Sequence, residues 1–147
     1  MRTDYGLRAL IDLAGHYPGP AVPCHEIAAR EHIPAPFLDQ VLMALRRHGL
    51  VLSTRGPRGG HVLARPPATI TLAQAIEILE GGSSQMGCFD TPDLCDIGAG
   101  CRLRSALRAA DRAAADVLAG TTLAELVSAP RPRQPQLAVA LAVGPAA

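Results

Sequence analysis

Residues 24–65 read CHEIAAREHIPAPFLDQVLMALRRHGLVLSTRGPRGGHVLAR, and this stretch decides the fold. Its first half carries apolar side chains at helical spacing in two segments, 24–31 and 37–49, which the proline-containing IPAP separates. Its second half carries two short apolar runs, 51–52 and 62–63, on either side of a glycine-rich turn, which is the pattern of a β-hairpin. Two helices joined by a short turn and followed by a hairpin predict a winged helix-turn-helix.

The segments on either side of this stretch also have helical patterns. They are residues 4–16, a helix after Thr71, a long alanine-rich helix over 102–119, and a short capped turn at 121–127. We therefore expect a mainly α fold, namely a winged helix-turn-helix with a small β-hairpin wing and a long C-terminal dimerisation helix. The expected parts are a DNA-binding domain (1–81), a cysteine segment with the dimerisation helix (82–128) and a flexible tail (129–147).

The composition limits the classes of function. A chain of 147 residues with 48% apolar side chains suffices for one small domain and an appended element. It opens with no basic leader and contains no run of 18 apolar residues, so we expect a cytoplasmic protein with no membrane partner. A phosphate-binding loop, paired catalytic carboxylates and a nucleophile with its base are all missing from the sequence, so we do not expect an enzyme.

The net charge is only +1, but the positive charge is concentrated in one region. No acidic residue lies between Asp39 and Glu77. The basic residues of that interval are Arg46, Arg47, Arg55, Arg58, Arg65, His48 and His61. Because an acid-free basic segment follows a helix-turn-helix, double-stranded DNA is the favoured partner, and a solvated turn is the alternative for the hairpin.

The residues expected to contact DNA lie at the start of the second helix and in the wing. Residues near that helix start reach base edges, and a glutamine such as Gln40 can pair bidentately with adenine. Asp39 either accepts from a cytosine amine or faces solvent. Wing arginines suit phosphate or the minor groove, and the wing glycines allow close approach to a backbone. The predicted contacts are Pro36, Asp39, Gln40, Arg55, Arg58, Gly59, Gly60 and His61.

Three of the four cysteines, Cys88, Cys95 and Cys101, lie in the short segment GCFDTPDLCDIGAGC. Thiolates are soft ligands that suit iron-sulfur clusters and zinc, and a reducing cytosol disfavours a disulfide framework. Six and then five residues separate these cysteines, which is wider than the usual spacing of zinc knuckles or bacterial ferredoxins. The segment therefore predicts a metal centre or a redox switch, and the alternatives are an opportunistic zinc site or plain packing. Cys24 lies in the DNA-binding part, where we do not expect a ligand.

The long helix over 102–119 is rich in alanine and would bury little surface if it packed alone. A partner helix from a second copy would cover its apolar stripe. We therefore expect a homodimer, whose two-fold symmetry matches a palindromic operator.

The chain resembles the Rrf superfamily of bacterial regulators, and within it the iron-sulfur sensors of the IscR, NsrR and RirA types. The resemblance covers residues 2–127 and is carried by DYGLRALIDLA at 4–14, by RGPRGG in the wing and by the three-cysteine segment. It implies a homodimeric winged-helix transcription factor whose long helices cross at the interface. It also implies a cluster, either 4Fe-4S or 2Fe-2S, that modulates DNA affinity.

The fourth cluster ligand is where the sequence departs from one of these types. The IscR type has a histidine three residues after the third cysteine, and here that position is Arg104, which cannot be a ligand. In NsrR-like members an aspartate near the start of the first helix of the other subunit completes the cluster, and Asp4 is at the matching position. The competing interpretation is that Asp4 caps its helix.

The expected function is therefore DNA-binding regulation that responds to nitric oxide, redox state or iron through a cluster on Cys88, Cys95, Cys101 and Asp4. A cluster-free thiol sensor is the alternative within the same class. An iron-sulfur carrier that binds no nucleic acid is the alternative from another class, and the arginine-rich wing argues against it.

Overall fold

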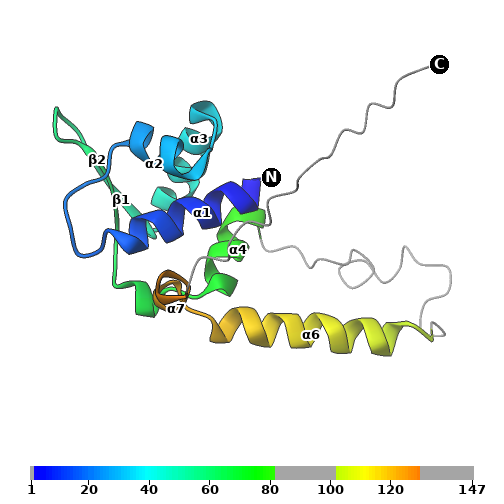
Figure 1. Ribbon diagram of the computed structural model, residues 1–147. Coiled ribbons are helices and arrows are strands. Elements are labelled where there is room, and N and C mark those ends of the chain that lie inside the picture. Colours follow the sequence, from blue (N-terminus) through cyan, green and yellow to red (C-terminus); the bar gives the residue numbers. More distant parts are fainter. Residues whose placement is uncertain (1, 82–101, 130–147) are drawn as a thin grey trace, which may run out of the picture.

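The structure is a computed structural model that describes residues 2–81 and 102–129 (Figure 1). Its elements are α1 (Arg2–Gly15), α2 (Cys24–Glu31), α3 (Ala35–Arg47), β1 (Val51–Thr54), β2 (Gly60–Leu63), the 3-10 turn η1 (Pro67–Thr69), α4 (Leu72–Glu80), α6 (Arg104–Gly120) and α7 (Leu123–Ser128). The predicted fold class is confirmed, since the chain is mainly helical and carries a winged helix-turn-helix with a two-stranded antiparallel hairpin.

Helix α1 lies at the centre of the hydrophobic core and contacts α2, α3, α4, α7 and β2. One face of α1 is fully buried because Ala9, Leu10 and Leu13 recur at helical spacing. The side chains of α3 that face α1, among them Leu38 and Leu42, are also fully buried. The core therefore joins the helix-turn-helix to the elements that come after it in the chain.

A buried ion pair fixes α2 against α1. Asp12 of α1 is only 5% exposed, and it accepts two hydrogen bonds from Arg30 of α2, to Oδ1 from Nε at 2.7 Å and to Oδ2 from an Nη at 2.9 Å. Both oxygens of the buried carboxylate are thereby paired, as a desolvated charge requires.

Two capping boxes define the starts of α4 and α7. Thr71 accepts from the backbone N–H of Gln74, and Thr122 accepts from that of Glu125, so each threonine satisfies a free amide of the first turn. The two caps lie side by side, joined by a β-bridge between Thr71 and Thr122. As a result Leu123 of α7 is fully buried in the same core as Leu10.

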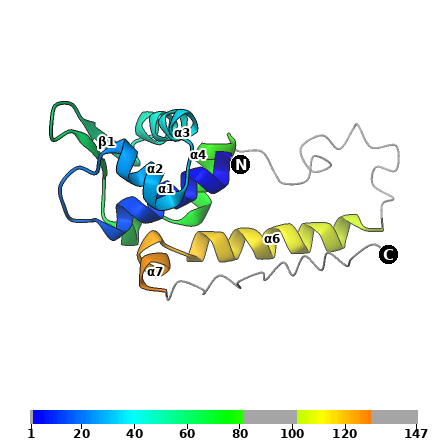
Figure 2. The ribbon, with the colours of Figure 1, turned by 45° about the horizontal axis from the view of Figure 1, so that its top comes forward.

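Helix α6 contrasts with these elements because none of its residues is buried. It runs along the side of the molecule away from α3 and the hairpin, at the bottom of both views (Figures 1 and 2). Within 2–81 and 102–129, no helix combines the length and the apolar character needed to cross a membrane.

Candidate nucleic-acid interface

The outer face of α3 carries a stripe of exposed residues that can enter a DNA groove. Pro36 and Gln40, both predicted from the sequence, are exposed, and Met43 and Arg47 continue the same stripe one and two turns further on. Met43 is 45% exposed, and its sulfur lies 3.2 Å from an Nη of Arg47. Met43 was missed as a candidate, although its spacing of seven residues from Pro36 contained the signal. Arg47, expected from the sequence to contact phosphate or to pair locally, lies on the same stripe eleven residues from Pro36 and contacts Met43. We call these four residues the recognition stripe.

Asp39 is next to the recognition stripe, on the flank that faces the start of α2. Its Oδ1 accepts a hydrogen bond from the thiol of Cys24 at 3.1 Å. Burial of Cys24 and this bond to the carboxylate raise the pKa of the thiol to about 11. Cys24 therefore keeps its proton at neutral pH and acts as a donor, the opposite of what a metal-binding thiolate needs.

The wing places its two arginines in the turn between the strands. The strands pair in register from Val51 with Leu63 to Thr54 with Gly60, and Arg55 and Arg58 are exposed in the intervening turn. The hairpin turn and α3 lie toward the top of both views, with α6 on the opposite side (Figures 1 and 2). The wing turn that carries the two arginines and the helix that carries the recognition stripe thus lie on the same side of the molecule.

The wing glycines are explained by the packing of the protein itself. A Cβ atom at Gly60 would overlap the backbone carbonyl group of Val22, and one at Gly59 would overlap the carbonyl oxygens of Thr54 and Gly56. Glycine is therefore required at both positions before any DNA is considered. Their predicted contact with a DNA backbone stays a prediction.

His61 supports the wing from its base. Its backbone N–H donates to the carbonyl oxygen of Val22 at 2.8 Å, and its own carbonyl oxygen accepts from the N–H of Val22 at 2.9 Å. Its Nδ1 lies 3.0 Å from the hydroxyl oxygen of Ser53. Burial lowers the pKa of His61 below its usual value; the charge of Asp39 opposes this shift and that of Arg46 adds to it. A ring that is neutral at physiological pH adds no positive charge for phosphate contacts.

Asp4 lies in the first turn of α1, which begins at Arg2, so its carboxylate is at the positive end of the helix dipole. Its carboxylate is 60% exposed and lies 3.2 Å from an Nη of Arg8. Thr3 donates to a carboxylate oxygen of Glu80 at 2.9 Å, so the start of α1 lies beside the end of α4. Asp4 is thus at the end of the molecule from which the chain continues toward the cysteine segment.

The three predicted cysteine ligands, Cys88, Cys95 and Cys101, lie outside the described residues. Among the residues that are described, no three or more His, Cys, Asp and Glu side chains come together in a way that could hold a metal ion. The three cysteine ligands therefore stay a prediction.

Residues 1–129 match the Rrf2 family, described as an iron-dependent transcriptional regulator. The chain belongs to the Rrf2 family. The HTH-type transcriptional regulator IscR of Vibrio vulnificus is 32% identical to it over 84% of this chain and 73% of the relative. Among solved structures, IscR of T. potens has a TM-score of 0.70 and 30% identity, covering 87% of this chain and 84% of the other. CymR, the global cysteine regulator of B. subtilis, has a TM-score of 0.75 and 30% identity, covering 87% and 94%.

Membership in the Rrf2 family identifies a DNA-binding transcriptional regulator and not an enzyme. The expected family and the winged helix-turn-helix are both confirmed by this match and by the similar folds of IscR and CymR.

Replacing Arg55 or Arg58 with alanine should weaken binding to operator DNA selected from random sequence. If the lost contact is to phosphate, the slope of log affinity against log salt should fall by about one. Arg112→Ala is the matched control, because it removes the same charge from α6, away from α3 and the wing. Binding that is unchanged in both wing variants would rule out the wing as a contact.

The lowered pKa of His61 predicts a pH dependence of stability. As pH falls below the usual histidine pKa of 6.5, the unfolded chain takes up a proton before the folded one, so the free energy of unfolding should decrease. Urea unfolding at about pH 7.5 and about pH 5.5 should show a smaller loss in His61→Gln than in the wild type. His25→Gln, an exposed site on α2, should keep the wild-type loss. Equal losses in all three proteins would show that His61 is not the group responsible.

Proposed function

We propose that this Rrf2 protein is a homodimeric regulator that binds a palindromic operator in the cytoplasm and responds to nitric oxide, redox state or iron. An iron-sulfur cluster, 4Fe-4S or 2Fe-2S, would be held by Cys88, Cys95 and Cys101 of one subunit and by Asp4 of the other. The observation that carries this proposal is the exposed carboxylate of Asp4 at the start of α1, which a second copy of the chain can reach.

The donor set fits a cluster chemically. Three thiolates and a carboxylate can bind iron, and a carboxylate is the weaker, more labile ligand. Cys24 is a poor fourth candidate because its raised pKa and its bond to Asp39 keep it protonated. When bound, the cluster would supply iron that reacts with oxygen or nitric oxide.

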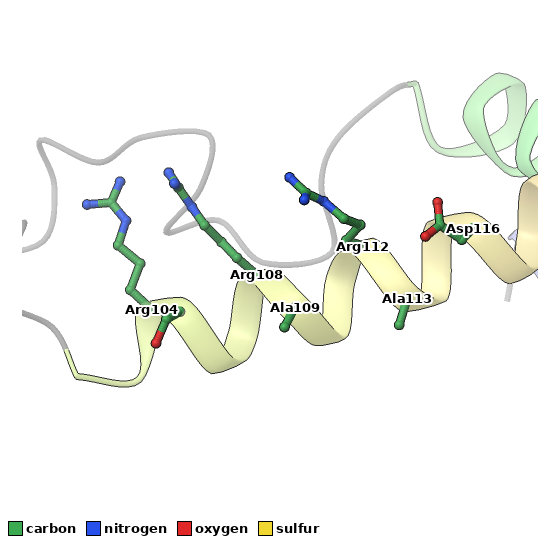
Figure 3. Close-up of a pocket in the computed structure, with 7 residues that line it drawn as sticks. Arg104, Arg108, Ala109, Arg112, Ala113 and Asp116 are labelled. Carbon is green, nitrogen blue, oxygen red and sulfur yellow. The ribbon is translucent and has the colours of Figure 1, made fainter.

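The exposed helix α6 supports the dimer. Leu103 and Val117 are each 67% exposed, and burial of such a side chain contributes about 1.5–3 kcal/mol. Arg104, Arg108 and Arg112 project from one side of α6, and Ala109 and Ala113 lie on the other (Figure 3). A face of small and apolar residues, kept clear of the arginines, suits close packing against the same helix of a second copy.

Arg8 supplies a physical link from Asp4 to the helix-turn-helix. One Nη of Arg8 is paired with Asp4, the other donates to the backbone carbonyl of Glu31, and Nε lies 3.7 Å from the Glu31 carboxylate. Glu31 is the last residue of α2, immediately before the turn into α3. If Asp4 binds the cluster, its carboxylate would present less negative charge to Arg8, so gain or loss of the cluster would weaken or strengthen a contact of the residue that also holds the end of α2.

On the DNA side, the proposal assigns base reading to Pro36, Asp39 and Gln40 of α3, now joined by Met43 and Arg47. The wing contributes Arg55 and Arg58, with Gly59, Gly60 and His61 at its base.

We also propose that the chain divides at 1–81, 82–128 and 129–147. Helix α7, near the end of the second part, packs into the core of the first part.

A cluster-free thiol sensor is the second candidate. The oxidized form of CymR from Staphylococcus aureus has a TM-score of 0.71 and 28% identity to this chain, covering 90% of it and 97% of CymR. In that case oxidation of Cys88, Cys95 or Cys101 would do the switching, with no iron. Membership in a family of transcriptional regulators argues against the iron-sulfur carrier.

The cysteine assignment can be tested in protein purified without oxygen. The wild type should contain iron and absorb visible light, and Cys88→Ala, Cys95→Ala and Cys101→Ala should each abolish the absorbance, because each removes one thiolate ligand. Cys24→Ser is the control and should keep it. If the wild type is colourless but an oxidant changes its DNA affinity in a way that these alanine variants abolish, the thiol sensor is correct and the cluster is not.

The Asp4 ligand can be tested separately. Asp4→Ala should speed cluster loss in air or nitric oxide, since one iron would lose its protein ligand. The melting temperature of the apo protein should hardly change, because an exposed ion pair such as Asp4–Arg8 contributes about 0–1 kcal/mol. Glu80→Gln, which removes another exposed charge at the same end of the molecule, should leave the rate of loss unaltered. Equal cluster lifetimes for Asp4→Ala and the wild type would exclude Asp4 as a ligand.

A further inference from the structure

Asp39 is in an unusual position for a carboxylate on a DNA-binding surface. It is exposed on α3, next to Gln40 of the recognition stripe, where a negative charge is repelled by phosphates unless it finds a donor on a base. Among amino acids at such positions, aspartate and glutamate accept from the N4 amine of cytosine. Whether Asp39 can recognise a cytosine therefore depends on how its carboxylate is oriented.

Cys24 supplies a fixed point for that carboxylate. It is the first residue of α2 and is half-buried against the hydrophobic core, and its sulfur lies 3.1 Å from Oδ1 of Asp39. In the part of the chain that the structure describes, Oδ2 of Asp39 has no hydrogen-bond partner. The thiol thus occupies one oxygen and leaves the other available as an acceptor.

The position of Cys24 is itself set by the wing. Val22 forms both of its backbone hydrogen bonds with His61 of β2, and Pro23 is the N-cap of α2. The three residues 22–24 therefore connect the wing, α2 and the flank of α3. A thiol held in this way can restrict the rotation of the Asp39 side chain, which has a broad range of terminal torsions when it is free.

We propose that Cys24 is a positioning residue for base recognition, which anchors Oδ1 of Asp39 so that Oδ2 can accept from the amine of a cytosine in each operator half-site. The inference rests on the DNA contacts of the proposed function and is independent of the cluster. Cys24 itself touches no base in this arrangement.

The test is selection of bound sequences from random double-stranded DNA by the full-length protein. The wild type should prefer cytosine at one half-site position, and Asp39→Ala should lose that preference. Cys24→Ala should reduce it at the same position by about threefold to tenfold, the value of one hydrogen bond. Cys24→Ser should restore it, because a hydroxyl also donates. His25→Ala, an exposed neighbour on α2, should match the wild type.

Each other outcome has a definite meaning. If Asp39→Ala loses the preference and Cys24→Ala keeps it, Asp39 reads the base without help from Cys24 and the proposal is wrong. If Asp39→Ala keeps the wild-type preference, the proposal is equally wrong, although the wing and the rest of α3 can still bind DNA. If the wild type selects no sequence at all, the DNA contacts of the proposed function are wrong, and the role of Cys24 that rests on them is wrong as well. The test compares the preference for cytosine at one position, so a Cys24→Ala protein that folds poorly would instead bind all sequences more weakly. In that case Cys24→Ser decides: it should show the wild-type preference for cytosine if the proposal is right, and a reduced preference would contradict it.

Discussion

The arrangement of this protein depends on one buried charge, the carboxylate of Asp12. Taking a carboxylate out of water costs several kcal/mol, and the cost is offset only when both oxygens are paired in good geometry. Arg30 does this from α2 with two hydrogen bonds, which favour one register of α2 on α1. Because Arg30 also pairs with Glu26 one turn earlier on α2, its guanidinium is oriented from its own helix as well. The helix-turn-helix is therefore attached to α1 by a directional contact in addition to non-directional apolar packing.

That attachment gives α1 two roles at two places along its length. Near its start, Thr3 is bound to Glu80 at the end of α4, and Asp4 is exposed. In its middle, Arg8 reaches the end of α2, and Asp12 holds the body of α2. A rigid helix of 14 residues thus connects the entry to the cysteine segment with the DNA-binding helices. If Asp4 binds the proposed cluster, a change there needs to alter only a few polar contacts to reach the turn before α3.

The sequence predicted the elements well because their causes are local. Apolar periodicity marked α1 and α3, Thr71 marked the cap of α4, and glycines between two apolar pairs marked the hairpin. It did not predict contacts between residues far apart in the chain. The bond between Cys24 and Asp39 joins residues 15 positions apart, and the burial of Leu123 against α1 depends on the bridge between two capping threonines. Gly60 was attributed to the approach of DNA, whereas the carbonyl of Val22 already requires it.

The same long-range contacts explain how the recognition helix α3 and the wing could contact one DNA duplex together. A recognition helix and a wing contribute together only if their spacing is fixed, since DNA grooves and phosphates have fixed spacings of their own. Here residues 22–24 fix it, because Val22 pairs with His61 on β2 and Cys24 binds Asp39 on α3. The ring of His61 adds a contact to Ser53 across the hairpin, and its burial, which lowers its pKa, favours the neutral form. A shift of α2 would therefore move the wing and the flank of α3 together, so a change in α1 that moves α2 would alter both of the proposed DNA contacts at once.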